Sequence, residues 1–421
     1  MKQKSVLIIG GGAAGLTAAV CAARQGARVT VLEKMDRVGK KILATGNGRC
    51  NIMNIGPLRY HGGEAFAKEV LAHADVHRVA AFFESLGLTL REEEEGRVYP
   101  ASGLASSVLD VLRLGCARHG VAVICGTAVS RIEKRSGGWV AYAGDKQYMA
   151  DAVIVAGGGK AARQLGSDGS VYALLTSQGH RLISPRPAIT QLKTETEPIR
   201  GLTGIRAQAE VWLTRDHVIQ KKETGEILFA EYGVSGVAAM QLARDAAEAT
   251  LHINLLPAIN IVEADLYPAL LRRAELFSGA PLEQFFSGWL HARLGMALLK
   301  RAGIGPLSRP CSSLSSKDIS ALAALIADFP LTVLGVQGFD SAQVTAGGID
   351  TGGFDPCTMA SRLAPGLYAA GEVLDVDGDC GGFNLLFAWA GGILAGEHAG
   401  ALPLDPAMGS APGPRSRDIT P

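Results

Sequence analysis

The chain has 421 residues, of which 48% are hydrophobic and 53 are glycine, and its formal net charge is +1. That length suffices for two or three domains, and the glycine content suits an α/β protein with many strand-to-helix turns. The near-neutral charge gives no electrostatic signature of DNA binding, and no apolar run is long enough to span a membrane. The seven cysteines are scattered, odd in number and form no CxxC pair. This argues against a disulfide framework or a metal site and, with a strand starting almost at residue 1, predicts the cytoplasm.

The first 33 residues carry a dinucleotide-binding pattern. A buried strand is predicted over 5–9, a helix over 13–25 and a second strand over 28–32. Gly10 permits the tight turn, Gly12 lets the backbone approach a pyrophosphate, and Gly15 lets helix and strand pack closely. Glu33 follows the second strand, where a carboxylate can bind both ribose hydroxyls of an adenosine. The alternative is a purely structural glycine turn that binds no ligand. The predicted contacts of this region also include Ala13, Ala14 and Lys34.

Positive charge is concentrated near the start of the chain. Residues 1–60 hold ten Lys or Arg and only two acids. Three interpretations stay open for this excess: it neutralises a cofactor pyrophosphate, it attracts a polyanionic substrate, or it is a solvated surface. The cations closest together in the sequence are Lys34, Arg37, Lys40, Lys41 and Arg49.

The rest of the chain divides by its periodicity. Residues 61–120 are predicted to be largely helical, with a polar loop or short hairpin in REEEEGRVYP, and strands are predicted over 121–124, 128–134, 139–142 and 151–156. Strand periodicity dominates from 191. Helical periodicity dominates 258–330, in VEADLYPALLRRAELF, PLEQFFSGWLHARLGMALLKRAG and SSKDISALAALIADF, with Pro268, Pro281 and Pro306 as punctuation. The predicted domains are a discontinuous nucleotide-binding domain (1–190 and 342–402), an inserted β-rich domain (191–257 and 331–341), an inserted helical domain (258–330) and a disordered tail (403–421).

The dinucleotide is predicted to be FAD. Three separated strands end in glycine, at 5–9, 151–156 and 366–370, which is the layout of flavoproteins with two dinucleotide-fold halves. A nicotinamide dehydrogenase would instead continue directly through alternating strands and helices. The fold class is therefore α/β, with a discontinuous Rossmann-like FAD-binding domain.

Five motifs extend this interpretation to a family. They are GGGAAG (10–15), GKKILATGNGRCN (39–51), GRVYPAS (96–102), VTAGGID (344–350) and TMASRLAPGLYAAGEVLDVDGDCGGFNLLFAWAGG (358–392). On these motifs the chain resembles the BaiN/RdsA (YhiN-like) family of FAD-dependent oxidoreductases over about residues 1–400. It departs from the family in LFAEYGVSGVAAM (228–240), where Glu231 and Val237 replace the usual His and Pro.

The resemblance implies an activity. NADH or NADPH would reduce the FAD without a Rossmann domain of its own, because the chain has no second GxGxxG. The reduced flavin would then reduce an activated C=C bond, in a uridine of 23S rRNA to give dihydrouridine or, alternatively, in a small-molecule enone such as a bile-acid or steroid intermediate. The basic N-terminal stretch favours the rRNA substrate. A non-catalytic flavin-binding redox sensor is the second alternative.

Two segments are expected to lie closest to the flavin. Glu372, after the third glycine-ended strand, is placed to bind a ribityl hydroxyl, unless it is a solvated strand-end acid. Gly382, Phe383 and Asn384 open a helix whose free N–H groups suit the edge of the ring that becomes negative on reduction. The remaining predicted FAD contacts are Gly39, Lys41, Thr45, Asn47, Gly48, Val129, Ala156, Gly157, Gly158 and Gly371.

The catalytic candidates are one cation and two thiols. Arg49 could stabilise developing negative charge, and Cys380 could donate a proton beside Gly381. Cys50 is a proton donor or, alternatively, a buried small hydrophobe. The histidines His61, His217 and His252 are expected to be ordinary surface or capping residues. The aromatic group Phe285, Phe286 and Trp289 is expected to be core rather than a stacking surface.

Overall fold

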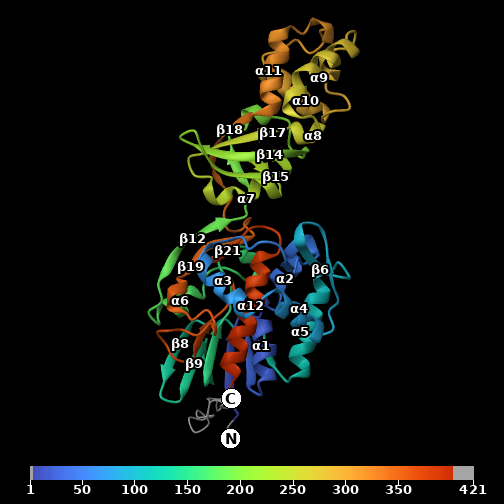
Figure 1. Cartoon of the computed structure of the whole chain (residues 1–421). Coiled ribbons are helices and arrows are strands. Elements are labelled where there is room, and N and C mark those ends of the chain that lie inside the picture. Colours follow the sequence, from blue (N-terminus) through green and yellow to red (C-terminus); the bar gives the residue numbers. More distant parts are fainter. Residues whose placement is uncertain (1–2, 402–421) are drawn as a thin grey trace, which may run out of the picture.

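The computed structural model describes residues 3–401, so the tail predicted at 403–421 lies outside the described residues. Three parts follow one another along the molecule (Figure 1): an α/β part that contains both ends of the described chain, a β-barrel, and a group of helices beyond the barrel. The fold class predicted from the sequence is confirmed. No helix within residues 3–401 is long and apolar enough to cross a membrane.

The α/β part is built on a five-stranded parallel sheet in the order β20-β11-β1-β2-β7. Because the strands are parallel, their carboxyl ends meet at one edge. The three glycine-ended strands are neighbours in this sheet, which brings residues 10, 156 and 370 together. The strands are β1 (Ser5–Ile9), β2 (Arg28–Leu32), β7 (Ala122–Ile124), β11 (Ala152–Val155) and β20 (Leu367–Ala369).

Two helices pack against each other beside this sheet: α1 (Ala13–Arg24) and α12 (Phe383–Gly400). Glycine on α12 permits the close approach, since a Cβ at Gly396 would lie 2.4 Å from the carbonyl oxygen of Ala18. α12 is buried along most of its length. Because it packs on α1, it joins the end of the described chain to its beginning.

The other elements of the α/β part surround this core. The REEEEGRVYP segment forms the antiparallel pair β5–β6, so of the two predicted alternatives the hairpin is correct. The sequence reading missed β10. The elements are α2 (Lys40–Ala44), β3 (Met53–Asn54), β4 (Tyr60–Gly62), α3 (Glu64–His73), α4 (Val76–Ser85), β5 (Leu90–Glu92), β6 (Arg97–Pro100), α5 (Ala105–Arg118), β8 (Arg131–Arg135), β9 (Gly138–Ala143), β10 (Lys146–Ala150), α6 (Tyr172–Thr176), β12 (Leu182–Ala188), β19 (Val344–Ile349) and β21 (Val376–Gly378).

The inserted β-rich part is a closed barrel in the order β13-β16-β15-β14-β17-β18. Closure leaves no free strand edge. The antiparallel pair of β12 and β19 leads into and out of it (Figure 1). The barrel elements are β13 (Leu192–Thr194), β14 (Arg206–Arg215), β15 (Val218–Ala230), β16 (Gly233–Ser235), β17 (Thr250–Asn254) and β18 (Phe329–Val336), with α7 (Val237–Gln241) after β16.

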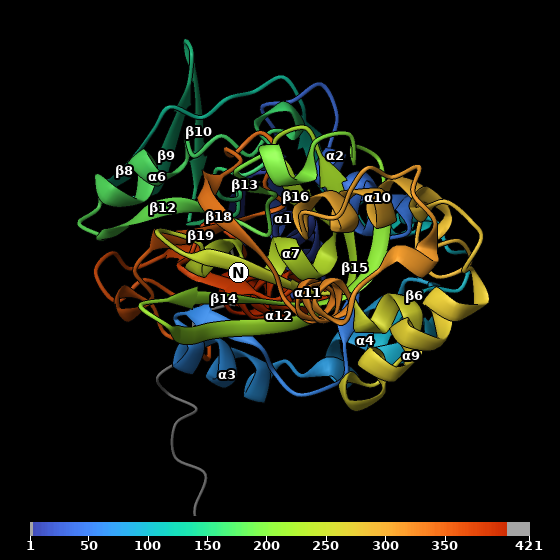
Figure 2. The same ribbon diagram turned by 90° about the horizontal axis from the view of Figure 1, so that it is seen from above.

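Four helices lie between β17 and β18 and share one hydrophobic core with the barrel. Phe285 and Phe286 are 0% and 2% exposed in that core, as predicted. Seen from above (Figure 2), α11 projects over α12, whereas α9 projects toward the side of α4 and β6. The helices are α8 (Leu256–Ile259), α9 (Glu263–Leu276), α10 (Ala292–Arg301) and α11 (Ser316–Ala327).

The helix predicted in VEADLYPALLRRAELF continues across its proline. Pro268 lies inside α9 rather than at its end. Its ring is on the exposed face of the helix, where water can bind the carbonyl group that loses its hydrogen bond to the missing N–H. The apolar positions Leu266, Ala269 and Leu270 on the opposite face are buried and hold the helix together across the proline.

Candidate active site

The turn between β1 and α1 leaves space for a ligand. A Cβ at Gly12 would meet no atom of the described residues within 4 Å, so the turn is open above this position. Gly15 is the opposite case, because a Cβ there would lie 1.9 Å from the carbonyl oxygen of Gly10. Ala13 and Ala14 begin α1 just after Gly12, so the free N–H groups of its first turn adjoin the open space. This geometry suits a bound phosphate.

Glu33 links the end of β2 to the same turn. One carboxylate oxygen accepts the backbone N–H of Gly11 at 2.7 Å, and the other accepts the backbone N–H of Met35 at 2.8 Å. Each oxygen keeps a further lone pair. The carboxylate is thereby fixed beside the glycine turn, where the sequence reading placed the ribose.

The second glycine-ended strand forms the next wall. The backbone N–H of Ala156 donates to the carbonyl of Ile9 at 2.8 Å, which holds Gly157 and Gly158 against the first turn. Ser167 faces Gly158, and its hydroxyl is buried without a hydrogen-bond partner among the described residues. An unpartnered buried hydroxyl of this kind is expected where a polar ligand binds. Val129 lies farther out, half-buried in the loop before β8.

The third glycine-ended strand brings Glu372 into a network of hydrogen bonds. One of its oxygens pairs with Lys41 Nζ at 2.6 Å, and the other accepts the backbone N–H and the hydroxyl of Thr345 at 3.0 and 2.9 Å. The Thr345 hydroxyl in turn accepts the backbone N–H groups of Lys160 and Ala161. Glu372 is therefore held between α2 and β19, and Gly371 beside it packs against Ala14. The sequence reading missed Thr345, although it stands in the VTAGGID motif.

The amino end of α12 contains a second unpartnered polar atom. Gly382 caps this helix with φ of 105° and packs against Asn51 and Met53. The Oδ1 atom of Asn51 is buried there without a partner among residues 3–401. Asn384 does not point into this space, because its side chain binds the backbone N–H and carbonyl of Gly378 at 2.8 and 2.7 Å. Asn384 therefore positions the loop before α12. The backbone carbonyl of Phe383 does the same by accepting a hydrogen bond from the Tyr60 hydroxyl.

These observations fit an FAD that extends from the glycine turn to the amino end of α12. The open space at Gly12 lies at one end, and the unpartnered Asn51 Oδ1 lies at the other. The segment 39–48 lies alongside: the backbone N–H of Gly39 donates to the Gly11 carbonyl, and Thr45, Asn47 and Gly48 form a tight turn after α2.

The three catalytic candidates differ in their surroundings. Arg49 pairs with Glu93 at 2.6 Å and stacks over the ring of Tyr99. Cys50 is 0% exposed, and burial raises its pKa to about 11, which describes a buried neutral thiol. Cys380 is half-buried between the α/β part and the barrel, beside Ile189 and Met240, and burial raises its pKa as well.

Four of the five most closely spaced cations of the basic N-terminal stretch form ion pairs, three of them with acids from distant segments. Lys34 pairs with Asp168 and Lys41 with Glu372, each at 2.6 Å, in addition to the Arg49–Glu93 pair. Lys40 pairs with Asp36. These pairs weaken the interpretation that the charge excess attracts a polyanionic substrate.

His61, expected to be an ordinary surface or capping residue, is 34% exposed and contacts an acid. Its Nε2 atom lies 3.0 Å from Asp379 Oδ1, and the same oxygen lies 3.2 Å from Nζ of Lys221 in the barrel. Asp379 precedes the first residue of α12 by four positions, so the cluster of Asp379, His61 and Lys221 borders the site. His252, in contrast, binds Thr214 and Asp328 within the barrel side of the molecule.

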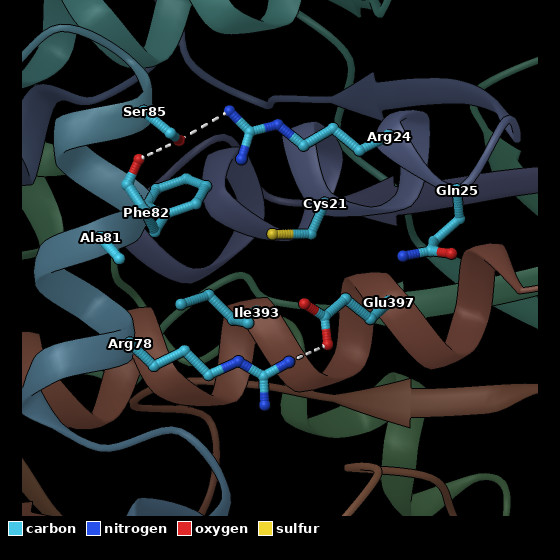
Figure 3. A pocket seen from close by; sticks show the side chains of 9 residues that line it. All are labelled: Cys21, Arg24, Gln25, Arg78, Ala81, Phe82, Ser85, Ile393 and Glu397. Atoms are coloured by element: carbon cyan, nitrogen blue, oxygen red, sulfur yellow. Dashed lines mark hydrogen bonds and ion pairs between the residues drawn. The ribbon is translucent and has the colours of Figure 1, made fainter.

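A hollow elsewhere in the α/β part is a weaker candidate. It is lined by residues of α1, α4 and α12, at the opposite end of α1 from the glycine turn (Figure 3). Its charged groups are already paired, Arg78 with Glu397 and Arg24 with the hydroxyl of Ser85. Burial raises the pKa of Cys21, the thiol that lines this hollow, to about 12, so it is a poor nucleophile.

Comparison with known proteins agrees with this geometry. The family model described as the HI0933-like protein Rossmann domain matches residues 4–398. The chain belongs to the HI0933-like family. This confirms the resemblance inferred from the motifs, and the family is one of FAD-dependent oxidoreductases with a Rossmann-type FAD-binding domain.

Two kinds of relative are similar over almost the whole chain. A 3-dehydro-bile acid delta(4,6)-reductase of Clostridium scindens is 38% identical over 408 residues, which are 94% of this chain and 99% of that protein. A ribosomal RNA dihydrouridine synthase of Haemophilus influenzae is 29% identical, covering 91% of this chain and 95% of the relative. The Escherichia coli ribosomal RNA dihydrouridine synthase is 27% identical, covering 93% and 96%.

Proposed function

We propose that this protein is an FAD-dependent reductase of a C=C bond conjugated to a carbonyl group, with NADH or NADPH as the electron donor. Both kinds of relative support this chemistry by their names: a Δ4,6 bond in a 3-dehydro bile acid and the C5=C6 bond of uracil are both conjugated to a carbonyl. When bound, FAD supplies the hydride that such a reduction needs.

One observation carries the proposal. The amino end of α12, with its free N–H groups, lies directly against the barrel: the backbone N–H of Cys380 donates to Gln241 Oε1 of α7 at 3.0 Å. A substrate held between the two parts would therefore lie beside the cluster in which Asp379 joins His61 of the α/β part to Lys221 of the barrel. Hydride transfer and proton transfer to neighbouring carbons require such a meeting of cofactor and acid groups.

The residues of the chain have separable tasks in this proposal. Glu33 and the glycine turn hold the adenosine diphosphate half, and Glu372 with Lys41 holds the middle of the cofactor. The amino end of α12 stabilises negative charge at the flavin edge, because its N–H groups and its dipole are fixed before the reaction. The barrel covers the site and limits the access of water.

The substrate we propose first is a uridine of 23S rRNA. The experiment reduces the purified flavoprotein without oxygen, adds a transcript of the 23S peptidyl-transferase region, and follows flavin reoxidation together with dihydrouridine in the RNA. Free reduced FAD with the same transcript is the control. Reoxidation coupled to dihydrouridine supports the proposal, whereas RNA that leaves the flavin reduced refutes this substrate.

A small-molecule enone is the second candidate, and a specific observation favours it. The relative with 38% identity is the bile-acid reductase, and four of the five most closely spaced cations near the start of the chain are already paired within the protein. The same reduced protein is therefore mixed with a 3-oxo-Δ4,6 steroid. Reoxidation by the steroid alone assigns the activity to small molecules. If neither acceptor reoxidises a flavin that ferricyanide does reoxidise, the C=C reductase proposal is wrong.

A further inference from the structure

Three titratable side chains from distant parts of the chain meet beside the amino end of α12. His61 comes from β4, Asp379 from the loop between β21 and α12, and Lys221 from β15 of the barrel. Asp379 Oδ1 accepts hydrogen bonds from both others, at 3.0 Å from His61 Nε2 and at 3.2 Å from Lys221 Nζ. The acid is 9% exposed, so this is a built cluster rather than a chance surface contact.

Lys221 is held in place from several directions. Besides Asp379, its Nζ atom lies 3.2 Å from Glu223 and 3.4 Å from the carbonyl oxygen of Gln241. These three acceptors match the three N–H bonds of an ammonium group. No N–H of Lys221 is left for a substrate, and so its role is to fix Asp379.

The charge state of Asp379 follows from its neighbours. Burial by itself would raise the pKa of this carboxyl, but the hydrogen bonds and charges of His61 and Lys221 outweigh burial and lower it. Asp379 is therefore an ionised carboxylate at neutral pH, and an ionised carboxylate only accepts hydrogen bonds. It follows that Nε2 of His61 carries the hydrogen in the bond to Asp379.

The other ring nitrogen of His61 is the one that can react. Within residues 3–401, Nδ1 has no hydrogen-bond partner, and the side chain is 34% exposed. The charged groups that act on this ring are Asp379, Glu64 of α3, and Asp377, which is paired with Arg244. Nδ1 is therefore the ring nitrogen that is open to exchange a proton with water or with a substrate.

We propose that His61 donates the proton in the C=C reduction, with Asp379 and Lys221 as positioning residues. The inference rests on the proposed function. The hydride adds to the carbon β to the carbonyl, the π electrons move toward the carbonyl, and the α-carbon takes the proton from His61 Nδ1. One C–H bond forms as the N–H bond breaks, and the neutral imidazole regains its proton from water.

Cys380 is a less suitable donor despite its place in the sequence. Its side chain packs with the apolar cluster of Ile189, Met240 and Val344, and its pKa is raised by burial. A thiol in that setting gives up its proton reluctantly. His61 is more exposed and is held by an ionised partner, which is the arrangement of an oriented general acid.

The test compares His61→Gln with His77→Gln, a matched change at an exposed site on α4. Each protein is reduced by NAD(P)H, mixed in D₂O with whichever acceptor the wild-type protein accepts, and followed for flavin reoxidation and for the face of the α-carbon that receives deuterium. We expect His61→Gln to slow reoxidation by about 100-fold or more, the usual contribution of a general acid. Ferricyanide, which needs no proton at carbon, should reoxidise all three proteins equally.

The pH dependence is the second readout. If His61 is the proton donor, reoxidation of the wild-type protein should depend on pH, and His61→Gln should lose this dependence. Asp379→Asn should slow reoxidation less than His61→Gln. If His61→Gln leaves the rate, the pH profile and the face that receives deuterium unchanged, His61 is not the proton donor. The proposed function would still stand in that case. A wild-type flavin that neither uridine nor enone reoxidises would overturn the proposed function, and this inference with it.

Discussion

The glycine turn offers a prediction in which two similar substitutions should act through different properties. Gly12→Ala places a methyl group in space that is open in the protein, and its φ of −89° and ψ of −161° are allowed for alanine. Gly15→Ala places the methyl group 1.9 Å from the carbonyl oxygen of Gly10, which is backbone and cannot rotate away. We expect the first to weaken FAD binding and the second to weaken the fold.

The magnitudes follow from what each methyl group displaces. In Gly12→Ala the protein without flavin should lose about 0.5–1 kcal/mol, because alanine is a poorer N-cap than glycine. Its FAD affinity should fall by about 10- to 150-fold, corresponding to one lost charged hydrogen bond of about 1.5–3 kcal/mol between backbone and phosphate. In Gly15→Ala, β1 and α1 must move apart, and overpacking of this kind costs about 1–3 kcal/mol or more.

The assay separates the two effects. Flavin is removed from each variant, urea unfolding gives the stability of the protein alone, and quenching of flavin fluorescence gives the FAD dissociation constant. Wild-type FAD affinity in Gly12→Ala would show that the turn does not approach the pyrophosphate. Wild-type stability in Gly15→Ala would show that the close contact with Gly10 is wrong.

Three further predictions concern buried groups. Glu33→Gln should lower stability by about 1–3 kcal/mol, because its amide NH₂ must face a backbone N–H of Gly11 or Met35; thermal unfolding without FAD measures this, and an unchanged midpoint contradicts it. Arg244→Met should cost about 3–5 kcal/mol, since Asp377 is left buried and unpaired. Burial raises the pKa of Asp377, so the folded variant holds a proton that the unfolded chain releases above about pH 4, and its stability should fall as pH rises from about 5 to 8; urea unfolding at both pH values tests the sign. Cys50, 0% exposed with a pKa of about 11, should resist iodoacetamide at pH 8 until urea unfolds the protein, and mass spectrometry that finds it alkylated in the folded state would contradict its buried position.

The dinucleotide-binding elements could be predicted because their signals are local. The strands over 5–9 and 28–32 and the helix beginning at Ala13 were predicted almost to the residue, since a glycine turn, hydrophobic periodicity and chain direction act over a few neighbours. The motifs also identified the family, because a run such as DVDGDCGGF can be recognised from the order of its residues without knowing which contacts they make.

Local signals failed where burial decided the outcome. Pro268 would end an isolated helix, yet α9 continues past it because its apolar face is packed and the proline faces solvent. The basic stretch looked unbalanced in the sequence, since its acidic partners Asp168 and Glu372 stand more than 100 residues away.

The sequence alone therefore determined the fold class, the family and the glycine turn after the first strand, each carried by residues close together along the chain. Only the tertiary structure decided what surrounds the reacting end of the site. Asp379 and His61 are 318 residues apart, and Lys221 reaches Asp379 from 158 residues away on the inserted barrel. No periodicity or spacing relates such positions, because their distance is set by how two separately packed parts of the molecule meet.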